Sequence, residues 1–217
     1  MNVQLPDPVT LIAVLGALAL VPFIALMVTS FVKIAVVLTL VRNALGVQQI
    51  PPNSAIYGLA IILTIYVMAP IGVSAYDSLR SKELSLSNRE QLMSDFAEAA
   101  LPFKAFLDKR VKADQKDFFL RTTRTMWPKE LADHVGPDSY LIVVPAFTVS
   151  ELTSAFEIGF LLYLPFIVID LIVSNILLAM GMMMVSPLTI SLPFKLFLFV
   201  MIDGWSRLIH GLVLTYQ

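Results

Sequence analysis

No charged residue interrupts the stretch IYGLAIILTIYVMAPIGVSAY at residues 56–76, which decides the fold class of this chain. A helix rises about 1.5 Å per residue and the hydrocarbon core of a bilayer is about 30 Å thick, so roughly 20 residues are needed for one crossing. The stretch has that length, and only Pro70 and Gly72 disturb its helical pattern near the far end. It is the clearest predicted membrane crossing.

Upstream, residues 9–41 form an apolar block that is longer than one crossing requires. Lys33 is its only charged residue. We expect a kink at Pro22 or a helix hairpin to absorb the excess length, because proline removes one helical hydrogen bond. A connector follows at residues 42–53, where Pro51-Pro52 prevents the helix from continuing.

Downstream, two more apolar blocks lie at residues 141–185 and at about 192–216. The first is about twice as long as one crossing requires, so we expect two helical pieces with a break near Gly159 or Pro165. The second predicts one further helix. The chain has 217 residues, of which 58% are hydrophobic and 14% charged, which is the composition of an integral membrane protein. The pattern predicts an all-α membrane protein with long, kinked helical hairpins.

Residues 77–139, between the second and third apolar blocks, are strongly charged, with both signs interspersed. This composition predicts a solvated helical insertion. A capping box at Ser87–Glu90 precedes apolar residues that recur at three- and four-residue steps from Leu92 to Val111, and a second short helix is expected at about 118–126. We therefore divide the chain into an N-terminal apolar hairpin, a charged helical region and a C-terminal apolar part, at residues 1–76, 77–139 and 140–217.

The basic residues near two short loops predict the orientation in the membrane. Arg42 follows the first apolar block and Lys195 lies beside the loop between the last two blocks. The positive-inside rule places both in the cytoplasm, and simple alternation then places the charged region and both termini on the other side. In a double-membrane bacterium, this orientation predicts a multi-pass protein of the inner membrane with its soluble region on the periplasmic side.

The sequence offers no anchor for catalysis. It contains no glycine-rich phosphate loop, nucleophile motif or paired-carboxylate motif, so we expect neither an enzyme nor a cofactor. His134 and His210 lack the further histidines or cysteines that a metal site would need. The net charge of -1 gives no field that would attract nucleic acid.

Charged residues inside the apolar blocks are costly, about 2.5 kcal/mol or more each if they face lipid at mid-membrane. They should face protein or water. Pairing between helices or subunits is the favoured interpretation, and a proton relay or ion path is the alternative. Asp203 and Arg207 stand four residues apart, the spacing of a pair within one helix. The charges in question are Lys33, Glu151, Glu157, Asp170, Lys195, Asp203 and Arg207.

Methionines cluster where the third apolar block ends, at Met180-Gly181-Met182-Met183-Met184. Methionine commonly fills gaps in a core, and that plain interpretation is the default. Three consecutive methionines, however, point to different sides of the chain, so at least one should face a lumen or a partner.

Several long segments resemble the FliP/SctR family (YscR-like), and the likeness extends over nearly the whole chain. The segments are VRNALGVQQIPPN (41–53), PAFTVSELTSAFEIGF (145–160), LPFIVID (164–170) and MGMMMVSPLTISLPFK (180–195). Because no basic region precedes the first apolar block, the chain looks more like an SctR subunit of an injectisome in virulence or symbiosis than like flagellar FliP.

The resemblance implies a core subunit of the export gate of type III secretion, through which unfolded effector and needle proteins pass. Several copies would assemble with SctS and SctT around a central pore, with SctU and SctV as further partners. The family's methionine gasket, which constricts the passage, carries over to Met182, Met183 and Met184, with Met180 beside it, and the buried charges would pair across subunit interfaces. The alternative from another class is a secondary transporter or proton channel subunit that uses Asp170.

Overall fold

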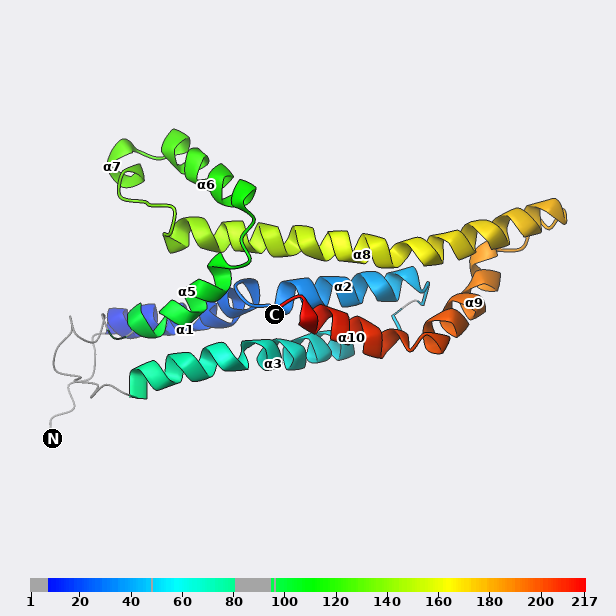
Figure 1. Ribbon diagram of the computed structural model, residues 1–217, viewed down its shortest axis with the longest axis horizontal. Helices are drawn as coiled ribbons and strands as arrows, with labels where there is room; N and C mark the ends of the chain where they lie inside the picture. The colour runs from blue at the N-terminus through cyan, green and yellow to red at the C-terminus, as the bar shows by residue number, and fades with distance from the viewer. Residues whose placement is uncertain (1–7, 48, 81–94, 96) are drawn as a thin grey trace.

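The computed structural model describes residues 8–47, 49–80, 95 and 97–217, and every element of these residues is a helix (Figure 1). The all-α prediction is confirmed for this part of the chain. The helices are α1 (Pro8–Met27), α2 (Phe31–Ala44), α3 (Asn53–Arg80), α5 (Leu101–Asp108), α6 (Ala113–Met126), α7 (Lys129–Ala132), α8 (Tyr140–Ala179), α9 (Pro187–Met201) and α10 (Gly204–Leu214).

The molecule is elongated, with its long helices side by side (Figure 1). Helices α1 and α2 run in the same direction, one after the other, and α3 returns antiparallel to α2. Helix α8 lies along α2 and extends beyond its end, and α9 and α10 return from the far tip. Helices α3 and α8 are long and apolar enough to cross a membrane, and the bent pair α9 and α10 would be a third span if it is counted as one.

The first apolar block breaks at residues 28–30 and not at Pro22, which lies inside α1. Thr29 and Ser30 supply the break, because their hydroxyls offer the backbone local hydrogen bonds outside a helix. The Thr29 hydroxyl accepts such a bond from the Phe31 N–H at 3.4 Å. Pro22 therefore does not end the helix, and the antiparallel hairpin of this part is formed by α2 and α3.

The expected break in the third block is also wrong, because residues 140–179 form one helix of 40 residues, about 60 Å long. Pro145 and Pro165 both lie inside it. Gly159 is a packing position: a β-carbon there would lie 2.2 Å from Leu40 Cδ1 of α2. The glycine thus allows α2 and α8 to approach closely.

The last block, expected as one helix, is instead two helices bent by 62°. Asp203 takes a left-handed conformation (φ 54°) between them. The bend is packed from inside by Phe199, whose ring contacts Trp205 edge-on at 5.3 Å between centroids. Gly204 leaves room for this ring, since a β-carbon would lie 2.4 Å from it.

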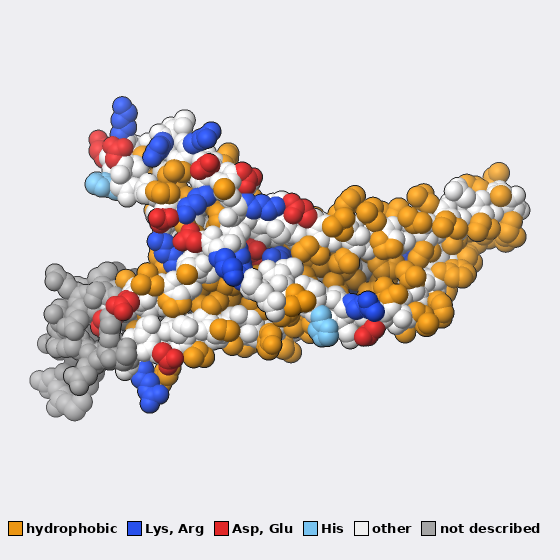
Figure 2. All heavy atoms as spheres, in the orientation of Figure 1, with side chains coloured by type: hydrophobic (Ala, Val, Ile, Leu, Met, Phe, Trp, Pro, Cys, Tyr) orange, Lys and Arg blue, Asp and Glu red, His pale blue; other side chains and the backbone are white. Residues whose placement is uncertain are grey.

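The charged region folds as helices, and the parts of it that the structure describes are α5, α6 and α7. The apolar residues Ala99 and Leu107 of the predicted helix face are buried, whereas the capping box at 87–90 lies outside the described residues. Helix α6 begins five residues earlier than expected and ends at Met126, before Pro128 as predicted. The lobe of α6 and α7 lies to one side of α8, against which α6 packs, and its charged side chains contrast with the apolar surface of α8 and α9 (Figure 2).

The core lies where α2 packs against α3 and α8, and α5, which packs against α3 and α8, adds Phe106 and Leu107 to it. Ile34, Val37 and Leu38 of α2 are fully buried, as are Val143 and Phe147 of α8. Arg42, expected in the connector, belongs to the last turn of α2, and its Nη1 donates to the Pro51 carbonyl and to Asn53 Oδ1.

Candidate pore loop and buried charge network

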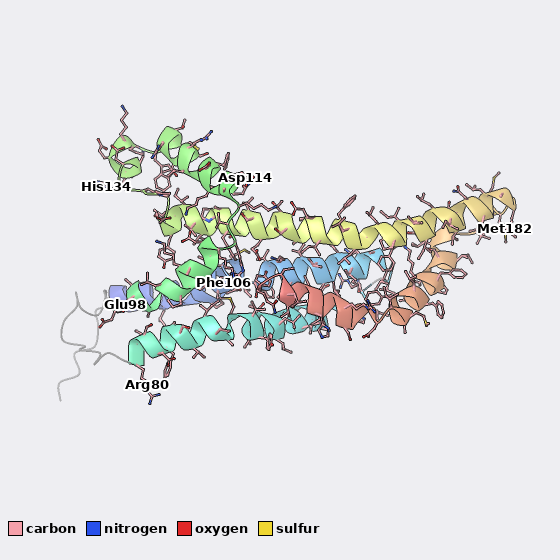
Figure 3. All side chains as sticks on the ribbon, in the orientation of Figure 1. Arg80, Glu98, Phe106, Asp114, His134 and Met182 are labelled. Carbon is pink, nitrogen blue, oxygen red and sulfur yellow. The ribbon has the colours of Figure 1, made fainter. Side chains whose placement is uncertain are left out.

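The methionine cluster lies at the tip of the hairpin that α8 and α9 form (Figure 3). Helix α8 ends in a Schellman motif, in which Gly181 takes a positive φ of 74°. The Gly181 N–H donates to the Leu178 carbonyl at 3.0 Å and the Met182 N–H to the Leu177 carbonyl at 2.9 Å. Pro187 then begins α9 at a position where its missing N–H costs nothing. Local sequence therefore fixes the turn.

The methionine side chains at this tip do not fill a core. Met183 is 84% exposed and Met184 is 100% exposed, while Met180 and Met182 are also exposed. Met182 marks the far end of the molecule (Figure 3). Large apolar side chains in such a position need a covering partner or a lumen to line.

A second feature ties the hairpin to the rest of the chain. Lys195 of α9 is buried, and its Nζ lies 2.5 Å from Asp170 Oδ2 of α8. The same ammonium donates to the Ala44 carbonyl at the end of α2, at 3.2 Å, and the Ser191 hydroxyl donates to Asp170 Oδ1 at 2.6 Å. These contacts of Asp170, Ser191 and Lys195 with one another and with Ala44 join three helices at one point, which we call the clamp. The rest of the hairpin extends from the clamp to the tip.

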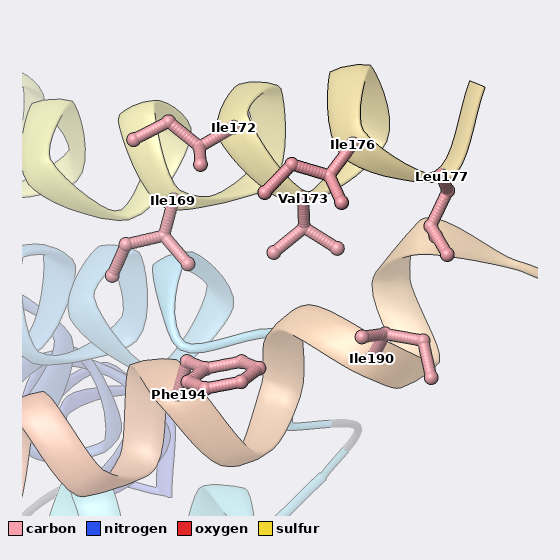
Figure 4. A pocket seen from close by; sticks show the side chains of 7 residues that line it. All are labelled: Ile169, Ile172, Val173, Ile176, Leu177, Ile190 and Phe194. Carbon is pink, nitrogen blue, oxygen red and sulfur yellow. The ribbon is translucent and has the colours of Figure 1, made fainter. Parts of the chain in front are cut away.

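Between this clamp and the tip, α8 and α9 enclose a groove lined only by apolar side chains (Figure 4). Isoleucines and Val173 from α8 face Phe194 and Ile190 from α9 across it. No charged group of the described residues lines the groove, so an ion path through it has no polar support.

A third feature is a buried ion pair in the core. Lys33 of α2 and Glu151 of α8 are 6% and 3% exposed, and their Nζ and Oε1 atoms lie 3.1 Å apart. The Tyr216 hydroxyl donates to the other carboxylate oxygen of Glu151. The Tyr216 ring lies 4.2 Å from Lys33 Nζ, so the tyrosine contacts both ions.

Arg110, after α5, extends this network on the side of Tyr216. Its Nη2 donates to the Tyr216 carbonyl at 2.6 Å and its Nη1 to the Phe106 carbonyl at 3.1 Å. Burial lowers the pKa of the Arg110 guanidinium, and the attraction of Glu151 opposes that effect.

A family model described as "FliP family" matches residues 14–212, which is most of the chain. The chain belongs to the FliP family. It is 62% identical to Yop proteins translocation protein R of Yersinia pestis over 214 residues, 99% of each chain. It is 46% identical to Harpin secretion protein HrcR of Erwinia amylovora over 216 residues, 100% of each chain, and 46% identical to Virulence protein YscR of Salmonella typhimurium over 216 residues, 99% of this chain and 100% of the relative.

Not every charge named from the sequence of this FliP family member is buried or paired as expected. Glu157 is largely exposed on α8 and lies 2.8 Å from Lys112 Nζ. Asp203 and Arg207 are both exposed, and no ion pair joins them in the described chain. The expected pair within one helix is wrong, because the helix breaks at Asp203 itself.

Three residues of these networks escaped the sequence analysis of this FliP chain: Ser191, Arg110 and Tyr216. Ser191 lies within the segment 180–195, four residues before Lys195 and on the same helix face, and this spacing is the signal that could have identified it. Arg110 stands among many charges of the soluble region, and nothing in its spacing distinguishes it. Tyr216 lies beyond residues 14–212 of the family match, and only the three-dimensional structure places it at the ion pair.

Proposed function

We propose that this chain is a pore-forming core subunit of the type III secretion export gate, and that it passes unfolded effector and needle proteins across the bacterial inner membrane. The exposed methionine loop carries the proposal. Its backbone is fixed by the Schellman motif while Met183 and Met184 project fully from the tip. Flexible thioether side chains on a rigid turn can close around irregular contents and adapt to them.

The extensive exposed apolar surface of α8 and α9 supports an assembly. Phe197, Val200 and Met201 of α9 are each more than 60% exposed, as is Leu161 of α8. Neighbouring copies of this chain, together with SctS and SctT and further with SctU and SctV, would cover these faces and surround the pore. The names of the relatives, which describe translocation and secretion proteins, agree with this role.

For the location, we propose a multi-pass inner-membrane protein whose lobe of α6 and α7 faces the periplasm, as positive-inside alternation predicts. The chain acts as a conduit without catalysis, cofactor or nucleic acid. The driving force for transport would come from other components.

The loop is tested by replacing Met182, Met183 and Met184 together with alanine in the assembled secretion complex. We expect assembly to be unchanged and small-ion leakage across the inner membrane to rise, measured as current or as dissipation of a dye-reported potential. Met126→Ala is the matched control, because Met126 is 75% exposed on α6, away from the loop. Unchanged leakage in a correctly assembled triple variant would contradict the proposal.

The alternative, a proton path through Asp170, makes a different prediction. The clamp favours a structural role, since both oxygens of Asp170 have partners on α9. We expect Asp170→Lys to stop secretion and the double exchange Asp170→Lys with Lys195→Asp to restore part of it. A relay acid would instead tolerate Asp170→Glu, fail as Asp170→Asn, and gain nothing from the exchange.

A further inference from the structure

The charges around Tyr216 do not balance. Lys33 and Arg110 both contact Tyr216, and Glu151 is the one carboxylate that the described residues bring to them. Two cations thus share one anion; Lys33 and Glu151 are buried, and Arg110 is partly buried. A buried charge without a counter-charge is costly, so a second anion would stabilise this cluster.

Arg110 also keeps unused donors. Its guanidinium has five N–H groups, and two of its nitrogens bind the carbonyls of Phe106 and Tyr216. The Nε atom is buried and has no hydrogen-bond partner. Burial lowers the pKa of Arg110 despite the attraction of Glu151, as expected where the charge is incompletely compensated.

An open groove lies beside this guanidinium, between α3 and α5. Arg110 and Lys109 supply its charge, and both are positive. Neither forms an ion pair within the residues that the structure describes. The walls are apolar and come from Val67 and Pro70 of α3 and Pro102 of α5. The groove therefore combines a cationic end with apolar sides, which fits a carboxylate on an apolar stem.

The level of the groove along α3 distinguishes two sources of an anion. Pro70 lies about 15 Å from the charged end of α3 at Arg80, and farther from the other end, at roughly 1.5 Å per residue. Lipid phosphates lie near the ends of a crossing helix. An acidic side chain of a protein can reach the middle level of the helix.

We propose that the groove beside Arg110 receives the carboxylate of an aspartate or glutamate from a neighbouring subunit of the assembly. This inference rests on the proposed function, because it requires that the chain has neighbours. The carboxylate completes the charge balance of the core network, so docking of the neighbour and the contacts of Tyr216 with Lys33 and Glu151 stabilise each other.

The test uses a photo-crosslinking residue at Ala105, which is exposed and lines the groove, in the full chain within bacteria that carry the whole secretion system. We expect a protein adduct whose crosslinked peptide contains an aspartate or glutamate. Its yield should fall at least about tenfold, equal to about 1.4 kcal/mol, in Arg110→Gln and persist in Arg110→Lys. Arg124→Gln is the control, since Arg124 is exposed on α6.

Neutralising the mapped acid of the partner should reduce the yield as much as Arg110→Gln, with no further loss when both changes are combined. An adduct of twice the chain's mass identifies a second copy, and another mass identifies a different subunit; both support the inference. Labelled lipid alone, or a yield that Arg110→Gln leaves unchanged, would overturn it.

Two controls separate this inference from other failures. In the isolated full chain, Arg110→Gln and Arg110→Lys should both lower the melting temperature modestly, because each loses hydrogen bonds to the Phe106 and Tyr216 carbonyls. A crosslink yield that falls as far in Arg110→Lys, which keeps the charge, as in Arg110→Gln would assign Arg110 a purely structural role and overturn the inference. If the wild-type chain forms no assembly on native gels, the proposed function fails. If it assembles and Arg110→Gln crosslinks normally, only the docking site fails.

Discussion

The pair of Lys33 and Glu151 should respond asymmetrically to mutation. Among the described residues, Glu151→Leu leaves the buried Lys33 ammonium with the Tyr216 ring beside it and no carboxylate, and it also removes the shorter of the two hydrogen bonds of the Tyr216 hydroxyl. Lys33→Met leaves Glu151 with one remaining donor, that hydroxyl. We therefore expect Glu151→Leu to be the more harmful change.

The magnitude follows from the burial of both groups. Removing one partner of a buried pair costs about 3–5 kcal/mol, because the other charge stays desolvated and unpaired. For a chain of this size, each kcal/mol lowers the melting temperature by about 2–4 °C. Lys33→Met should thus lower it by about 6–12 °C and Glu151→Leu by up to about 20 °C. The double variant should recover most of this loss, since replacing both partners with apolar residues is often neutral or stabilising.

Thermal unfolding of the full chain in detergent, followed by fluorescence of Trp127 and Trp205, measures these shifts. Lys112→Met is the matched control, because the Lys112 and Glu157 side chains are 37% and 60% exposed and such a pair contributes less than about 1 kcal/mol. A double variant as unstable as Glu151→Leu would refute the reasoning. So would a control that is as harmful as Lys33→Met.

Three further predictions concern packing, the turn and pH. Gly159→Ala should force α2 and α8 apart at Leu40 and cost about 1–3 kcal/mol, measured by the same unfolding assay. Gly181→Ala, which strains a left-handed residue by about 1–2 kcal/mol, should weaken export more than it lowers the melting temperature. A hydrogen bond from Lys116 lowers the pKa of Asp138 below its ordinary value of 3.8, so this contact stabilises the lobe above about pH 4 and is lost as the pH falls through the lowered pKa. Hydrogen exchange around Asp138 should therefore accelerate at pH 3 relative to pH 7, and Asp138→Asn should remove the difference.

The local features of this fold could be predicted from sequence because their causes are local. The turn after α8 depends on Gly181 and Pro187, and the predicted end of the block at this loop agrees with the structure. Residues 56–76 lie within the single helix α3 because an uncharged run of that length has no reason to break.

Bends and pairings depended on information that one sequence does not contain. Pro165 was expected to break α8, yet the helix continues through it, as membrane helices do where neighbours support the backbone. Asp203 was assigned to a helix interior, although packing of Phe199 against Trp205 fixes a bend there. Lys33 and Glu151 are 118 residues apart. The charge of each residue predicts that it needs a partner, but the sequence does not identify that partner.

The burial along α8 shows how its excess length is used. Eight of its ten buried residues lie between Ile142 and Gly159, in the half of the helix that α2, α5 and α6 cover. Beyond Gly159 only Phe166 and Leu177 are buried, although the sequence stays just as apolar. The first half of α8 is therefore stabilised within the chain, and the second half, held to the body by Asp170 and Lys195, presents apolar surface and the methionine loop. Hydropathy alone cannot distinguish these halves, because it measures only how strongly a segment avoids water. It does not show whether lipid, the same chain or another subunit covers the apolar side chains.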